Sequence, residues 1–169
     1  MRHRARQIDL GSGIVLTQRR KGAEAQKFMS LKLILILEDN EDRIRNFQSE
    51  VKSLGENFSV RIWFDAPNMI ADLPSILKQA SLISLDHDLN PQSNVTTDPG
   101  TGLEVAEFLA KHSPVCPVLI HSTNHEKAWS MHNELRFGNW QVDRVGPIGD
   151  DWIQCLWLPK VKSLLSISD

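Results

Sequence analysis

The stretch SLISLDHDLN, from Ser81 to Asn90, is the part of the sequence that decides the fold. It begins as a short apolar run, typical of a strand buried on both faces, and it ends abruptly in Asp86, His87 and Asp88. In an open α/β sheet, ligands bind beyond the carboxyl ends of the strands. The stretch therefore predicts a site with two carboxylates and an imidazole at a strand end. The alternative is a polar loop in which Asp88 caps a turn.

Alternating strand and helix patterns extend on both sides of this stretch. Apolar or alternating runs predict strands over 31–37, 58–64, 81–85, 117–120 and 140–145. Helical spacing predicts helices over 41–54, 66–79, 101–112, 125–137 and 151–165, with a break or kink at Pro74 in the second. We expect a doubly wound, flavodoxin-like parallel sheet in the strand order 2-1-3-4-5, with helices on both faces. The polar loop over 91–100 is the expected mobile lid.

Length and composition restrict the class of protein. The 169 residues, with 24% charged residues and a net charge of −2, fit one domain of ordinary size. Cys116 and Cys155 lie in apolar surroundings and suggest neither a disulfide framework nor a zinc cluster. No apolar run reaches the ~20 residues that span a bilayer, and no secretory signal is evident. We therefore expect a cytoplasmic protein.

Basic residues are concentrated at the amino end. Residues 1–28 contain seven Lys or Arg against Asp9 and Glu24, which gives this segment a charge of +5 within a chain of −2. We expect residues 1–29 to form a basic extension, disordered or adding a single strand, and residues 30–169 to form the domain. Because no aromatic residue precedes Phe28, nucleic acid is not the expected partner. A natural start at Met29 is kept open.

Polar side chains also follow two other predicted strands. Glu38 and Asp39 follow the first, and His121, Ser122 and Asn124 follow the fourth. If strands one, three and four are neighbours, these groups meet the carboxylates that end strand three. Carboxylates gathered in one crevice repel each other, so they need a cation that prefers oxygen ligands, such as Mg²⁺ or Mn²⁺, or else a raised pKa.

Three carboxylates, Glu38, Asp39 and Asp86, are the expected ligands of that divalent cation, with Asp88 contributing directly or through water. The competing interpretation of Glu38 and Asp39 is that they belong to the cap of the following helix. Asn40, followed by two acidic residues, suits the amino end of a helix.

At this point the motifs carry a resemblance. The succession ILILEDN, LISLDHDL, TGLEVAEFL and PVLIHST resembles the receiver domains of bacterial response regulators over residues 31–165. The resemblance implies that Glu38 and Asp39 bind Mg²⁺, that Asp86 accepts a phosphoryl group, and that Ser122 is the hydroxyl residue ending strand four. The receiver lysine, expected beside the Gly146-Pro147 pair, is missing, and Arg144 is the nearby cation.

The strings SLDHDL and IHSTN are similar to a receiver-like family proposed to process cyclic phosphates. In that family, histidines have joined the acidic pocket of the receiver. The resemblance implies functional roles for Asp39, Arg43, Asp86, His87, Asp88, His121, Ser122 and Asn124.

Opening a cyclic phosphodiester needs a base, an acid and positive charge on the non-bridging oxygens. His87 and His121 are expected to divide the acid and base roles, since free imidazole changes protonation near a pKa of ~6.5. Asp86 or Asp88 would orient a histidine, and the phosphate would be held by Ser122, Asn124, Arg43 or a metal. The expected ligand is a small phosphorylated molecule or cyclic nucleotide, and no membrane is involved. Two alternatives stay open: phosphotransfer to Asp86 with Mg²⁺, and a non-catalytic binding module.

Overall fold

The computed structural model describes residues 31–91 and 97–167. In this part of the chain, five parallel strands form one sheet in the order β2-β1-β3-β4-β5, as the sequence predicts. The strand bounds are β1 Lys32–Leu37, β2 Phe58–Trp63, β3 Ala80–Leu85, β4 Val118–His121 and β5 Val142–Val145. Strand β2 lies on one side of β1 and strand β3 lies on the other, so the chain crosses over β1 between β2 and β3. The carboxyl ends of β1 and β3 therefore flank the crevice where doubly wound sheets bind ligands.

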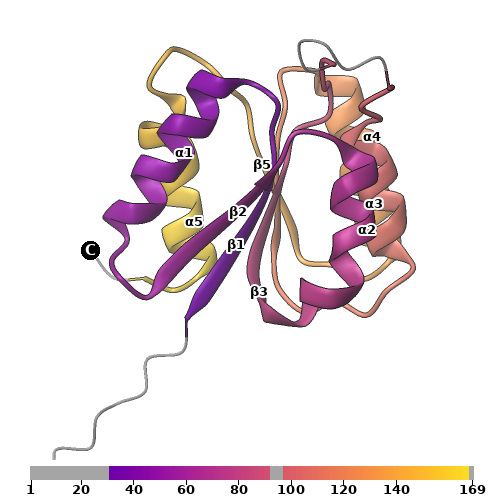
Figure 1. Ribbon diagram of the computed structural model, residues 1–169, viewed down its shortest axis with the longest axis horizontal. Helices are drawn as coiled ribbons and strands as arrows, with labels where there is room; N and C mark the ends of the chain where they lie inside the picture. Colours follow the sequence, from indigo (N-terminus) through magenta and orange to yellow (C-terminus); the bar gives the residue numbers. More distant parts are fainter. Residues whose placement is uncertain (1–30, 92–96, 168–169) are drawn as a thin grey trace, which may run out of the picture.

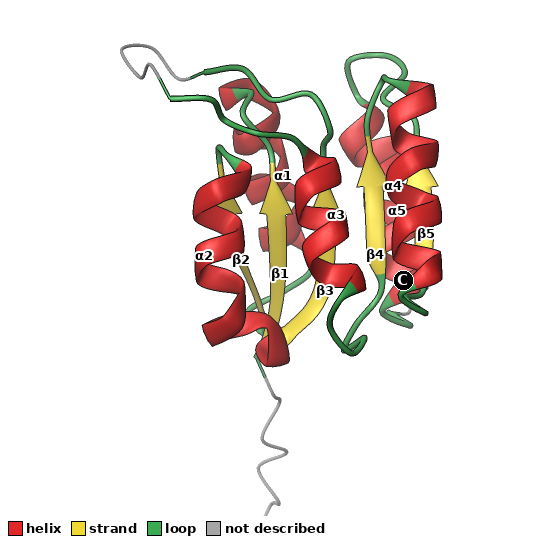
Figure 2. Cartoon of the chain, turned by 90° about the vertical axis from the view of Figure 1, so that its right-hand side faces the viewer, coloured by secondary structure: helices red, strands yellow, loops and turns green. Residues whose placement is uncertain are grey.

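Helices cover both faces of this sheet (Figure 1). The helix α1 and the last helical segment, η2 with α5, pack on one face, while α2, α3 and α4 pack on the other (Figure 2). The helical bounds are α1 Glu41–Ser53, α2 Ala66–Ile76, the 3₁₀ turn η1 Leu77–Gln79, α3 Gly102–Ala110, α4 His125–Phe137, the π-helical segment η2 Ile153–Trp157 and α5 Leu158–Leu164.

The alternation of side chains along β1 divides the core into two halves. Ile34 and Ile36 face α1 and α5 together with Phe47 and Trp157, and all four are fully buried. The intervening Leu35 and Leu37 join the half of the core under α2, α3 and α4. A central strand buried on both faces in this way fixes the register, because a slip by one residue would exchange the two sets.

Two predicted elements differ in detail from the structure. The second helix does not break at Pro74 but continues to Ile76, and only its last residues tighten into the 3₁₀ turn η1. The last helix begins with the π-helical segment η2 just before Pro159, which lacks the N–H that a regular α-helix would use there. The fifth strand begins at Val142, two residues later than predicted.

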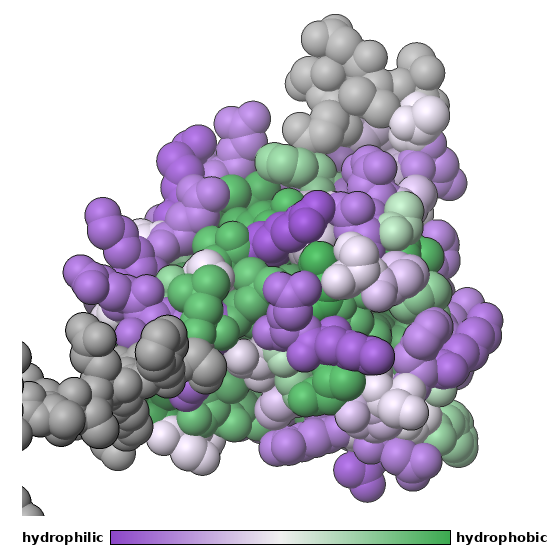
Figure 3. Space-filling view, turned by 60° about the horizontal axis from the view of Figure 1, so that its bottom comes forward, coloured by the Kyte–Doolittle hydropathy of each residue, from purple (hydrophilic) through white to green (hydrophobic). Residues whose placement is uncertain are grey.

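Tryptophan contributes mainly to the core. Trp140, Trp152 and Trp157 are buried, whereas Trp129 is 45% exposed. Seen toward the amino ends of the strands, hydrophobic side chains lie between hydrophilic ones (Figure 3). Among the described helices, none has the length and apolarity to cross a membrane. The predicted basic extension 1–29 and residues 92–96 of the predicted lid lie outside the described residues.

Candidate functional site

The polar residues predicted to meet do lie at one edge of the sheet. Glu38 follows β1, Asp86 follows β3, and His121 is the last residue of β4. Backbone hydrogen bonds continue past the strand ends: Asp86 N–H donates to the carbonyl of Leu37 at 3.0 Å, and Glu38 N–H donates to that of Trp63 at 3.0 Å. The pleated sheet itself therefore holds the backbone of both carboxylates.

A buried group of charges forms the floor of this edge. Glu38 and His121 are fully buried, and Asp86 is 4% exposed. The Arg43 guanidinium bridges two carboxylates, with Nη1 lying 3.6 Å from Glu38 Oε2 and 3.4 Å from Asp86 Oδ2. His121 Nε2 lies 3.5 Å from Glu38 Oε2, but the two atoms do not form an aligned hydrogen bond. The guanidinium and the imidazole thus surround one carboxylate oxygen.

The three predicted metal ligands come together beside this group. Glu38, Asp39 and Asp86 each offer a carboxylate oxygen within 4.8 Å of the others. Glu38 Oε2 is buried and has no hydrogen-bond donor among the described residues, so it has acceptor capacity left for a cation. Asp39 Oδ2 accepts two hydrogen bonds from Asn90, at 2.7 Å from its N–H and 2.9 Å from its side-chain amide. Carboxylate oxygens are the kind of ligand that suits a hard divalent cation.

Capping of α1 does not use these carboxylates. The Asn40 side chain caps the helix by accepting hydrogen bonds from the N–H groups of Asp42 and Arg43, both at 3.0 Å. Glu38 Oε1 accepts the Asn40 N–H at 2.9 Å, which orients its other oxygen toward the site. Asn40 therefore caps the helix, whereas Glu38 and Asp39 do not cap it and remain available to the site.

A second, more exposed group lies on the solvent side. His87 Nδ1 and Asp88 Oδ1 are 2.5 Å apart, and Asn124 Nδ2 donates to Asp88 Oδ2 at 3.1 Å. Asn124 also caps α4 by accepting the Lys127 N–H at 3.2 Å, and its own N–H donates to Ser122 Oγ at 3.2 Å. All the predicted residues of strands three and four are therefore brought together.

Burial and neighbouring charges shift the acidic groups in opposite directions. Burial raises the pKa of Asp86, and the Glu38 charge adds to this rise, against the opposing effects of His121 and Arg43. Burial also acts on Glu38, but its contacts with His121, Asn40 and Arg43 outweigh it, so the Glu38 pKa lies below its usual value. Hydrogen bonds from His87 and Asn124 outweigh slight burial and lower the pKa of Asp88. Asp86 is therefore the carboxylate that most needs a compensating cation.

Three residues of the site were not predicted from the sequence. Ser84 and Trp157 are fully buried: the Trp157 Nε1–H donates to Ser84 Oγ, and Ser84 Oγ is hydrogen-bonded to His121 Nδ1. Gly102 begins α3, where its N–H donates to the His87 carbonyl at 3.1 Å, and a Cβ there would lie 1.9 Å from the Asp86 carbonyl oxygen. A serine interrupting an apolar strand and a glycine starting a helix are visible signals, whereas Trp157 reads as an ordinary core residue.

No lysine takes the place of the missing receiver lysine in the described part of the chain. Arg144 lies over the Trp129 ring, 3.6 Å from its centroid, and Lys160 pairs with Asp143. Arg43 is the cation that contacts Asp86. The positive charge beside Asp86 is therefore supplied by a residue of α1.

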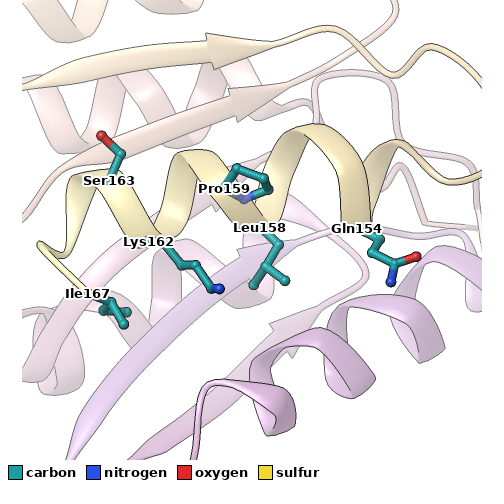
Figure 4. Close-up of a pocket in the computed structure, with 6 residues that line it drawn as sticks. All are labelled: Gln154, Leu158, Pro159, Lys162, Ser163 and Ile167. Carbon is teal, nitrogen blue, oxygen red and sulfur yellow. The ribbon is translucent and has the colours of Figure 1, made fainter. Parts of the chain in front are cut away.

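Two surface cavities adjoin the site. One of about 560 Å³ shares Asn90 and has Phe64 in its wall, and one of about 330 Å³ shares Arg43. A third cavity, of about 420 Å³, lies along η2 and α5 and shares no residue with the site (Figure 4). Two of these cavities are thus lined by residues that contact the site carboxylates, namely Asn90 and Arg43.

Comparisons with known proteins agree with the fold. A family model described as "Cyclic-phosphate processing Receiver domain" matches residues 33–137. Similar solved structures include the phosphorylated cyanobacterial phytochrome response regulator RcpA, with a TM-score of 0.63, 18% identity, and coverage of 83% of this chain and 98% of that one. A receiver domain from Rhodospirillum rubrum gives 0.60, 15%, and 81% and 95% coverage. The response regulator domain of Thermotoga maritima CheB gives 0.57, 16%, and 82% and 99%. No curated protein is matched.

Proposed function

Because this chain belongs to the family of cyclic-phosphate processing receiver domains, we propose that it opens cyclic phosphates by hydrolysis, with nucleotides as the candidate substrates. The observation that carries the proposal is the His87–Asp88 pair, 2.5 Å apart, beside Asp86 and its acidic neighbours. A phosphoacceptor aspartate has no need of an oriented imidazole, whereas hydrolysis of a ring ester does.

The contacts of His87 suit it to act as the base. The lowered pKa of Asp88 keeps its carboxylate ionised, so this group is an acceptor and His87 Nδ1 carries the proton between them. In the neutral ring, Nε2 is then the basic nitrogen, and it has no hydrogen bond to another described residue. His87 Nε2 takes a proton from the attacking water as the new O–P bond forms and the ring ester P–O bond breaks. That proton then neutralises the leaving oxygen, so the ring finishes neutral.

Groups around His87 can hold the phosphate. The Ser122 hydroxyl and the Asn124 amide lie on the solvent side, and the Arg43 guanidinium lies beside Asp86. A divalent cation held by Glu38, Asp39 and Asp86 would add positive charge opposite the non-bridging oxygens. The site therefore combines positive charge for the phosphate oxygens with an imidazole, His87, that can transfer a proton.

The role predicted for His121 as a second acid or base stays a prediction. Its ring is fully buried and contacts Glu38, Ser84 and the aromatic core, not the surface. We therefore assign direct proton transfer to His87.

Turnover of a panel of 2′,3′-cyclic nucleotides and simpler cyclic phosphates, followed by phosphorus NMR, tests the proposal. His87→Ala should reduce turnover about 10²-fold or more. His112→Ala is the matched control, because His112 is exposed and stacks on Phe108 at the end of α3. Equal turnover by wild type and His87→Ala would contradict the assignment.

The runner-up is phosphotransfer to Asp86, and the acidic cluster in a receiver fold favours it. Acetyl phosphate with Mg²⁺ would then add one phosphoryl group, visible as a mass increase that His87→Ala retains and Asp86→Asn abolishes. A protein that neither turns over a cyclic phosphate nor gains this mass would be a binding module.

A further inference from the structure

Two linked hydrogen bonds run from the core to the His121 ring beside the site. The Trp157 indole Nε1–H donates to Ser84 Oγ at 2.9 Å, and Ser84 Oγ lies 2.8 Å from His121 Nδ1. All three residues are fully buried. His121 Nε2, at the other end of the ring, faces Glu38 Oε2 at 3.5 Å. Glu38, which follows β1, is thus arranged in a row with residues of β4, β3 and η2.

The donors and acceptors of this row assign the proton on His121. An indole N–H only donates, so Ser84 Oγ accepts from Trp157 and its hydroxyl proton needs an acceptor. Among the described residues, His121 Nδ1 is the acceptor within reach. If Nδ1 instead carried a proton, the hydroxyl proton of Ser84 would be buried without an acceptor, at a cost of about 1–3 kcal/mol. The neutral ring therefore carries its proton on Nε2, pointing at Glu38.

Aromatic neighbours hold the plane of the same ring. Trp152 stacks on His121 with ring centroids 5.8 Å apart and an angle of 26°, and Phe47 meets it edge-on at 5.0 Å. Trp152 directly precedes the π-helical segment, and Trp157 is its last residue. A π-helical turn is uncommon and is often found at functional sites. Here it lies between an indole that stacks on His121, Trp152, and an indole that donates to the Ser84 hydroxyl, Trp157.

We propose that Ser84 and Trp157 are positioning residues that fix the tautomer of His121 and, through it, the orientation of the Glu38 carboxylate. Glu38 Oε1 accepts the Asn40 N–H, and the imidazole Nε2 faces Oε2 at 3.5 Å without an aligned hydrogen bond, so the ring limits the orientation of the carboxylate by proximity. The consequence for cation binding rests on the proposed function, whereas the tautomer does not.

The tautomer is read from nitrogen NMR of the His121 ring, recorded with a chelator present. In wild type, we expect Nδ1 to give the signal of a bare nitrogen and Nε2 that of a protonated one. Ser84→Ala should let the ring populate the other tautomer, and Trp157→Phe should do so partially. Trp140→Phe is the matched control, because its buried indole donates to the Leu109 carbonyl at 2.9 Å in the other half of the core.

Mn²⁺ affinity provides the second measurement. Partners that orient metal ligands typically contribute 10–100-fold to affinity, so Ser84→Ala should weaken Mn²⁺ binding about tenfold while Trp140→Phe leaves it unchanged. Urea unfolding of each variant separates this loss from a general loss of stability.

A wild-type ring protonated on Nδ1 would overturn the inference without any variant, even if Ser84→Ala fails to fold. An unchanged tautomer in a folded Ser84→Ala protein would overturn it too. If the tautomer behaves as expected but wild type binds no Mn²⁺, the inference about His121 stands and the cation part of the proposed function fails.

Discussion

Replacing Gly102 by alanine tests the close approach of α3 to the site. A Cβ at this position would lie 1.9 Å from the Asp86 carbonyl oxygen and 2.9 Å from Met131 Cε, and contacts under 3.0 Å are essentially never seen. The end of β3 or the start of α3 must therefore move by about 1.1 Å. Gly102 has no positive φ, so conformational preference alone predicts that alanine stabilises the protein by about 0.4–1 kcal/mol.

The clash should outweigh this gain. Overpacking typically costs about 1–3 kcal/mol, and a backbone carbonyl cannot rotate away as a side chain can, so we expect a cost near the upper end. The net loss is then about 2 kcal/mol in the free energy of unfolding. With a urea slope of about 2 kcal/mol/M, the midpoint should fall by about 1 M.

Urea unfolding followed by tryptophan fluorescence measures this shift. Gly146→Ala is the matched control: Gly146 also lacks a positive φ, and a Cβ there meets nothing within 4 Å, so its stability should change by no more than about 0.5 kcal/mol. A Gly102→Ala protein as stable as wild type would show that α3 does not approach Asp86 in this way.

Two further predictions concern the charges of the site. Arg43→Gln should lower the free energy of unfolding by about 1–3 kcal/mol, because Glu38 and Asp86 lose a shared cation. The control Arg45→Gln, whose partners are exposed, should cost less than about 1 kcal/mol. Equal effects of the two changes in urea titrations would contradict the Arg43 bridge. Asp86→Asn should be more stable than wild type at neutral pH with chelator, because burial raises the folded pKa and makes the charged form unfavourable. Its advantage should disappear as the pH falls below the ordinary aspartate pKa of 3.8, and an advantage independent of pH would argue against a buried charge.

Periodicity was sufficient to predict the sheet and most of its helices. The apolar run at β1 and the strand end at Asp86 determine the order of strands, because parallel crossovers leave few topologies. The helix over 66–79 was predicted, but a break at Pro74 does not occur, since a helix packed on the core can tolerate a lost backbone hydrogen bond that local rules count against it. The π-helical turn before Pro159 has no comparable sequence signal.

The residue types of the site could also be predicted from the sequence, but not which of them are fully buried. Polar residues after strands mark His87 and His121 equally, yet His87 pairs with the exposed Asp88 whereas His121 is fully buried between Phe47 and Trp152. That difference depends on which face of the sheet each ring occupies and on aromatic residues far away in the sequence. For the same reason, the hydrogen bond from Trp157 to Ser84 required the structure.

The most direct measurement of the central claim is a crystal soaked with Mn²⁺ and a slowly hydrolysed cyclic phosphorothioate, with the metal located by anomalous scattering. We expect an anomalous peak bound by Glu38, Asp39 and Asp86, with the phosphorus centre within reach of His87 Nε2 and the Ser122 hydroxyl. A metal bound away from this cluster, or a ligand whose phosphate does not reach His87, would contradict it.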